Sequence, residues 1–128
     1  MRRSPCPLAS SLDLFGDRWS LILIRDLLAG KSRYGEFLNS PERIPSNILA
    51  DRLRLLERFG IVKKAPYQQR PVRYAYELTD KGADLVPVLQ AMVTWGNAHI
   101  PDCWRPPDWF TTLTPEALKR AGNKPPQR

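Results

Sequence analysis

The sequence predicts an α+β fold that is mainly helical and contains one two-stranded hairpin. Apolar residues recur at helical spacing through most of the chain, and each helical segment ends near a glycine or a proline. Only between residues 61 and 78 does the pattern become extended and rich in aromatic and β-branched residues. The 128 residues fit one domain, whose core is small enough that part of it can be shared with a second copy.

Two helices are predicted first, over residues 7–14 and from residue 18 or 19 to residue 28. Pro7 suits the first position of the first helix, and Asp17 can cap the second. The apolar residues of the second helix cover most of its circumference, which is typical of a central core helix.

A short helix over residues 34–38 and a turn-rich connection lead to the most regular helix, over residues 45–59. One face of this helix is apolar. A second stripe, at steps of three and four residues, contains Asn47, Ala50, Asp51, Arg54 and Arg58. A helix with one apolar face and one Asn/Arg face is suited to a groove of DNA.

A hairpin and then further helices follow. Strands over residues 61–67 and 72–78 flank a polar turn. Thr79 can cap a long helix over residues 80–99, which Pro87 can kink.

The tail from residue 101 differs in composition, because it holds six of the 13 prolines. We expect one short helix there, beginning near Thr114 and ending at Gly122, with frayed chain over residues 123–128.

A short helix, a turn, a basic amphipathic helix and a hairpin, in this order, are typical of a winged helix-turn-helix. In this motif the second helix enters the major groove of DNA with its N-terminal residues at the base edges. The hairpin, or wing, can reach the DNA backbone or the neighbouring minor groove. A winged helix can also act as a protein-docking module without duplex DNA binding, and this alternative stays open.

The charge of the chain is concentrated in one segment. The chain has 20 Lys and Arg against 13 Asp and Glu, a formal net charge of +7. Between Arg43 and Tyr76 eight basic residues face only two acidic ones, Asp51 and Glu57. Such a concentration indicates a polyanionic partner, with a solvated basic surface as the alternative.

Composition also argues against several functions. No apolar run reaches the ~20 residues that cross a bilayer, and the basic start does not resemble a signal peptide, so we expect a cytoplasmic protein without a membrane partner. Cys6, Cys103 and His99 are too few and too scattered for a metal site, and no glycine-rich phosphate loop is present. We therefore expect neither an enzyme nor a cofactor.

The candidate DNA contacts come from the short helix, the amphipathic helix and the wing. They are Arg33, Tyr34, Ser46, Asn47, Ala50, Asp51, Arg52, Arg54, Arg70 and Arg73. Asn47 can bond adenine through two hydrogen bonds, or only solvate a helix start. Arg52 lies nearer the apolar edge and suits a phosphate contact or an internal salt bridge. Arg73 suits a wing contact, or a surface charge paired across the strands.

Several segments resemble HxlR-type regulators. The N-terminal signature of that family is similar to residues 6–9, 14–19, 23–28 and 33–37 of this chain. Its recognition helix is similar to residues 48–57, its helix exit to residues 60–62, and the return strand of its wing to residues 72–79. Trp95 and Gly96, shortly before His99 and Ile100, also fit, so the resemblance covers about residues 5–100.

The resemblance implies a winged helix-turn-helix with N- and C-terminal dimerisation helices, and repression or activation of a nearby promoter. Residues 1–100 would form the DNA-binding domain with these helices, and residues 101–128 a Pro-rich C-terminal extension. Surplus apolar residues on the long helix agree with a homodimer on two half-sites; they are Leu85, Val88, Leu89, Met92 and Val93. An effector that is a small molecule or an oxidant is compatible with the family resemblance.

Cys6 matches the exposed N-terminal cysteine of the family, a thiol that senses oxidants or electrophiles in some relatives. As a helix N-cap near Arg2 and Arg3, it would lie in the electropositive surroundings that suit a reactive thiol. The alternative is a small hydrophobic residue packed at the dimer interface. The family pattern implies no role for Cys103.

Overall fold

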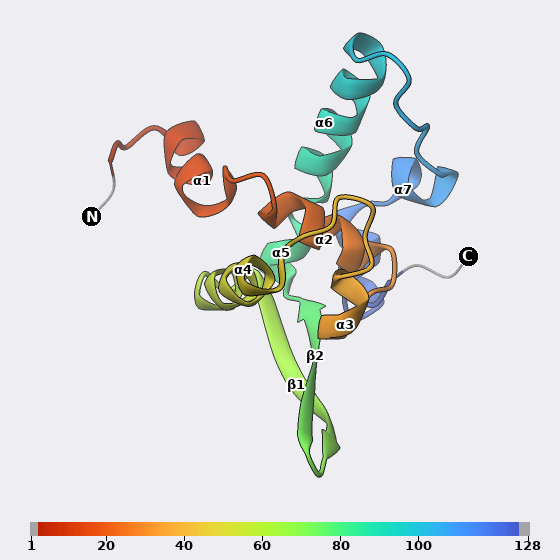
Figure 1. The fold of residues 1–128 in the computed structure, drawn as a ribbon. Coiled ribbons are helices and arrows are strands. Elements are labelled where there is room, and N and C mark those ends of the chain that lie inside the picture. The colour runs from red at the N-terminus through yellow and green to blue at the C-terminus, as the bar shows by residue number, and fades with distance from the viewer. Residues whose placement is uncertain (1–2, 126–128) are drawn as a thin grey trace.

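The computed structural model describes residues 3–125, which form eight helices and one two-stranded sheet (Figure 1). The elements in chain order are α1 (Pro7–Phe15), α2 (Ser20–Leu28), α3 (Tyr34–Phe37), α4 (Ser46–Arg58), β1 (Val62–Gln69), β2 (Val72–Leu78), α5 (Asp80–Ala83), α6 (Val86–His99), α7 (Asp108–Thr112) and α8 (Pro115–Arg120). The fold is therefore the mainly helical α+β fold with a wing that the sequence predicts.

The core lies where α2, α4 and the base of the hairpin meet. Leu23 and Ile24 of α2, Phe37 of α3 and Leu49 of α4 are at most 1% exposed. The prediction that α2 is the central core helix is confirmed. Phe37 and Leu49 belong to one buried cluster, so α3 and α4 pack against a common apolar centre.

The hairpin extends away from this core (Figure 1). β1 and β2 are antiparallel, from Val62 paired with Leu78 at the base to Gln69 paired with Val72 at the tip. The turn contains only residues 70 and 71, so β1 runs two residues further than predicted. An irregularity at residue 67, between Pro66 and Gln68, changes the register.

The long helix predicted over residues 80–99 is two helices. α5 ends at Ala83, and α6 begins at Val86. Pro87 has no N–H to donate to the carbonyl of Ala83, one turn earlier, and helix continuity is lost there.

The N-terminal helix α1 projects from the body of the molecule (Figure 1). None of the α1 residues is buried in the described structure.

The extension after residue 100 packs back onto the body. It forms α8 as predicted and also α7, which the proline-rich composition did not indicate. Phe110 of α7 is 6% exposed and Leu118 of α8 is 2% exposed, and both belong to the same buried cluster as α2 and α4.

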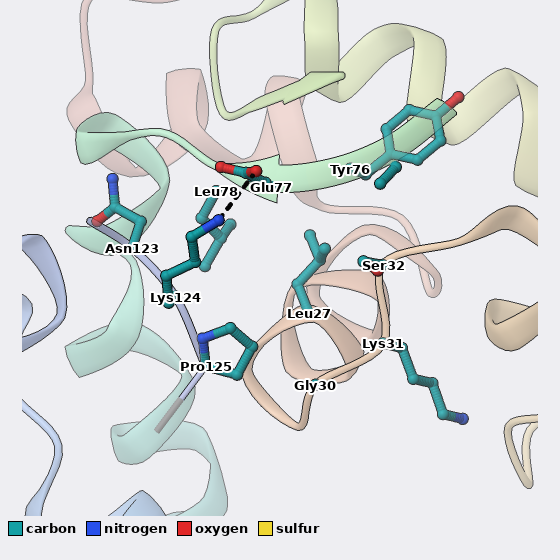
Figure 2. A pocket seen from close by; sticks show the side chains of 11 residues that line it. Leu27, Gly30, Lys31, Ser32, Tyr76, Glu77, Leu78, Asn123, Lys124 and Pro125 are labelled. Atoms are coloured by element: carbon teal, nitrogen blue, oxygen red, sulfur yellow. Dashed lines mark hydrogen bonds and ion pairs between the residues drawn. The ribbon is translucent and has the colours of Figure 1, made fainter. Parts of the chain in front are cut away.

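The prediction of frayed chain after residue 122 is wrong for Asn123 and Lys124. The Asn123 amide donates to Asp80 Oδ1 at 2.9 Å. Lys124 Nζ lies 3.4 Å from Glu77 Oε1 (Figure 2). These residues close one side of a cavity of about 260 Å³ between α2 and β2. Residues 126–128 lie outside the described part of the chain.

Candidate DNA-binding surface

α3 and α4 are joined through two of the predicted site residues. The Tyr34 hydroxyl donates to the Ser46 carbonyl at 2.6 Å and lies 3.0 Å from Ser46 Oγ. Phe37 and Leu49 are completely buried beneath them. Ser46, the first residue of α4, is therefore held by α3, as in a helix-turn-helix.

The polar stripe of α4 faces solvent. Ser46 and Asn47 are exposed, and Ala50 and Asp51 are half-buried. The Arg54 side chain is 66% exposed, with Nη1 3.6 Å from Asp51 Oδ1. At this exposure such a pair contributes little and leaves the guanidinium accessible.

The first turn of α4 has open backbone donors. Pro45 is the N-cap residue and, in the described structure, no side chain caps this end. Backbone N–H groups at a helix N-terminus favour phosphate oxygens. The exposed side chains of Ser46 and Asn47 stand beside these donors, so the end of α4 can meet both a backbone phosphate and a base edge.

Arg52 points to the protein interior. Its Nε lies 3.5 Å from Asp17 Oδ2, and its side chain is 28% exposed. This Nε is buried and has no hydrogen-bond partner among the described residues. The structure thus contains the ion pair that the sequence suggested, between α4 and the turn before α2, and the phosphate contact of Arg52 stays a prediction.

Arg33 connects α3 to the wing. Its guanidinium lies 4.0 Å from the centre of the Tyr67 ring, and its backbone forms an isolated bridge with Ala75. The Tyr76 N–H donates to the Ser32 carbonyl at 2.7 Å. These contacts set the angle of the wing relative to α3 and α4.

Glu36 supports the same junction. One of its carboxylate oxygens accepts the N–H groups of Ser32 and Arg33, each at 2.9 Å. These backbone hydrogen bonds hold the pKa of the Glu36 carboxyl below its usual value. The carboxylate therefore stays ionised at neutral pH and keeps the start of α3 ordered.

The wing carries exposed cations. Arg70 lies in its turn and Arg73 on β2, and both are exposed. Within residues 3–125 neither forms an ion pair, so both charges are available to a polyanion. Lys63 on β1 is a further exposed cation of the wing that was not among the candidates. The local excess of basic residues was the signal that could have added it.

Cys6 is an exposed free thiol at the N-cap of α1. Its neighbour Arg3 is committed elsewhere, because Arg3 Nε donates to Asp13 Oδ1 at 2.8 Å. Arg2, the other cation expected beside the thiol, lies outside the described residues. Cys103 is also free and exposed.

Two kinds of site are not found within residues 3–125. No helix there is long and apolar enough to cross a membrane. No group of three or more His, Cys, Asp or Glu residues is placed to hold a metal ion.

The helix α4 has an exposed polar stripe and lies beside a hairpin that carries exposed cations. This arrangement is that of a winged helix-turn-helix, the class of DNA-binding transcription regulators. A model of the HxlR-like helix-turn-helix family matches residues 14–103. The chain belongs to this family.

Known relatives agree with this assignment. The HTH-type transcriptional regulator YdeP of Bacillus subtilis is 37% identical over 94 residues, which cover 73% of each chain. Three mycobacterial relatives are longer, and the match covers 61% of their length.

Two solved structures of regulators have the same fold. The redox regulator HypR in its oxidised form is 36% identical with a TM-score of 0.67, over 73% of this chain and 97% of HypR. The reduced form of the transcriptional regulator YodB from B. subtilis is 32% identical with a TM-score of 0.63, over 79% of this chain and all of YodB.

Proposed function

We propose that this regulator binds duplex DNA sequence-specifically as a homodimer and acts in the cytoplasm by binding, without catalysis. The observation that carries the proposal is the exposed stripe of α4 together with Arg70 and Arg73 of the wing, which form no ion pair within the described part of the chain. The family match favours this function over the protein-docking alternative. Whether binding represses or activates a promoter depends on the operator position.

The contacts divide into base readers and backbone contacts. Asn47 and Arg54 are exposed on α4 and suited to base edges, with Ser46, Ala50 and Asp51 lining the same face. Arg70 and Arg73 suit phosphates, because they stand on the wing without an anionic partner among the described residues. Three further candidates position these contacts instead of making them. Arg33 contacts the wing, Tyr34 contacts the start of α4, and Arg52 contacts the turn before α2.

The proposed dimer surface is made of apolar side chains that one chain leaves in water. Val88, Met92 and Trp95 of α6 are 38%, 58% and 61% exposed, and Leu8 and Leu12 of α1 are 69% and 54% exposed. Apolar patches of this kind are typical of protein interfaces.

The surface differs from the set expected from the sequence. Leu89 is 5% exposed and belongs to the core, and Leu85 and Val93 pack against that core. Two recognition helices placed by such a dimer would read half-sites about 34–36 Å or a multiple apart.

The test begins with a binding site selected from random duplexes. If a dimer contacts six to ten phosphates, affinity falls about 10³- to 10⁵-fold between 50 and 200 mM salt. Asn47→Ala then costs about 1–3 kcal/mol at one base pair of each half-site and leaves other sequences unaffected. Arg73→Ala weakens binding to every sequence and makes the salt dependence shallower.

Arg120→Ala is the control, because Arg120 is an exposed residue of α8, and this variant leaves binding unchanged. A log–log salt slope shallower than about −2, or an equal loss on all sequences for Asn47→Ala, contradicts the proposal.

We also propose that Cys6 makes DNA binding responsive to oxidants or electrophiles. Its thiol is accessible, and α1 lies within the proposed dimer surface, so modification there would disturb the spacing of the recognition helices. Peroxide or a quinone is then expected to change operator affinity in the unmodified protein and in Cys103→Ser. Cys6→Ser removes this response and keeps reduced binding. An unchanged response in Cys6→Ser would exclude the thiol as the sensor.

A further inference from the structure

Side chains of α6 hold the extension in a defined position. The Gln90 amide donates to the carbonyls of Phe110 and Leu113, at 2.8 and 2.7 Å. The Asn97 amide donates to the Trp104 carbonyl at 2.9 Å. The segment between residues 104 and 113 is thus tied to α6 near both ends, and Phe110 is anchored in the core.

Between this segment, α2 and α6 lies a cavity of about 570 Å³. Its volume is within the range of about 300–1,000 Å³ typical of small-molecule sites. Trp104, Trp109 and Phe110 form aromatic walls, and Val93 contributes from α6. The Trp109 and Phe110 rings meet edge to face, with centres 6.0 Å apart.

The aromatic walls come from the part of the chain that the family model does not cover, since the match ends at residue 103. Trp104 is 80% exposed. A tryptophan in this state keeps a large apolar surface in water, and a flat apolar molecule against it would remove that surface from solvent.

The charges at the cavity are both positive. Arg25 and Arg105 are among its lining residues, which include no carboxylate. Arg25 is already engaged, because its guanidinium bonds Glu42 at 2.7 Å and Asp26 at 2.8 Å. Arg105 has no hydrogen bond or ion pair with any residue between 3 and 125. The cavity therefore has one uncommitted guanidinium beside a mainly apolar surface.

We propose that this cavity binds a small molecule with a flat apolar body and one carboxylate. The body packs against Trp104 and Trp109, and the carboxylate accepts two hydrogen bonds from the planar guanidinium of Arg105. Val93 and Phe110 close the apolar side, where a charged group has no partner, so that the carboxylate has one favourable orientation.

Isothermal titration of the full chain with naphthoate, and with its neutral analogue naphthamide, tests the proposal. Naphthoate binds one molecule per chain, more tightly than naphthamide. Arg105→Gln weakens naphthoate binding about 10- to 100-fold, the effect of losing a charged hydrogen bond, and leaves naphthamide binding unchanged. Trp104→Ala, at an exposed position that the fold tolerates, weakens both ligands. Arg120→Gln on α8 is the matched control and alters neither.

Three results would overturn the proposal. The first is absence of naphthoate binding to the unmodified chain at millimolar concentration. The second is equal naphthoate affinity in Arg105→Gln. The third is a change of oligomeric mass in Trp104→Ala, which would mean that a second copy of the chain covers this face. The titrations need no DNA, so their failure leaves the proposed function untouched.

Discussion

Asp17 shows how one side chain organises two parts of this fold. Its carboxylate accepts the N–H groups of Trp19 and Ser20, at 2.9 and 3.0 Å, just before α2. The same group faces Arg52 of α4. Burial opposes its ionisation, but hydrogen bonds from Ser20 and Trp19 together with the Arg52 charge outweigh burial and lower the pKa of the Asp17 carboxyl.

We expect Asp17→Ala to lower the free energy of unfolding by about 1–2 kcal/mol at pH 7, because it removes the acceptor of two backbone N–H groups at the start of α2 and the ion pair with Arg52. A lowered folded pKa means that this stabilisation is complete above the unfolded value of about 3.9 and is lost as pH falls through the folded pKa. Urea unfolding at neutral pH and at about pH 3 measures the difference between the unmodified and variant chains.

That difference should shrink at the lower pH. Asp13→Ala provides the control, since Asp13 is exposed and its pair with Arg3 should contribute almost nothing. A difference that is the same at both pH values would show that the charge of Asp17 does not stabilise the fold.

At the scale of elements, Gly82 determines how closely α5 approaches the base of the wing. A Cβ at this position would lie 2.3 Å from the Ile61 carbonyl oxygen and 2.9 Å from a Leu78 methyl group. The structure shows a close approach of α5 to the entry of β1 and the end of β2, which only glycine allows.

Gly82→Ala is therefore expected to destabilise the protein by about 1–3 kcal/mol, although alanine has the higher helix propensity. Gly35→Ala in α3 is the comparison, because nothing lies within 4 Å of the added methyl group. This variant should be neutral or more stable by up to about 1 kcal/mol. Thermal unfolding of both variants measures the contrast, and equal stability of the two would refute the packing argument.

At the scale of the whole molecule, the exposed apolar faces of α6 and α1 remain uncovered in one chain, whereas α7 and α8 cover other parts of the core. Met92 and Trp95 are more than half exposed, one turn apart on α6. Such a surface in water favours association with a second copy, and the two-half-site model of DNA binding requires that association.

The double variant Met92→Glu and Trp95→Glu should be monomeric, because each dimer would otherwise bury four unpaired carboxylates. Light scattering at micromolar concentration should give twice the chain mass for the unmodified protein and the chain mass for the variant. Thr94→Glu, on the side of α6 that faces α7, should stay dimeric. A monomeric unmodified protein, with and without DNA, would contradict the dimer.

Much of the fold and of the candidate site follows from local sequence. The apolar period placed α2 and α4, Thr79 marked the start of α5, and the polar stripe of α4 identified Asn47 and Arg54 as exposed. These features depend on residues within one or two turns of each other, where backbone hydrogen bonding and side-chain periodicity are determined by neighbours in the chain. The predicted cap of α2, Asp17, is wrong, because the N-cap residue of that helix is Trp19.

The tertiary structure decided which distant residues contact one another. Arg52 pairs with Asp17 across 35 positions, Gln90 fixes α7 from 20 or more positions away, and Leu89 lies in the core instead of the exposed face of α6. A periodic pattern states which residues share a helix face, but the element that covers this face depends on how distant segments pack. The sequence by itself therefore determined the first four helices, the wing and the family. Packing decided where the helix after the wing divides, that α7 forms, and which charges take part in ion pairs within residues 3–125.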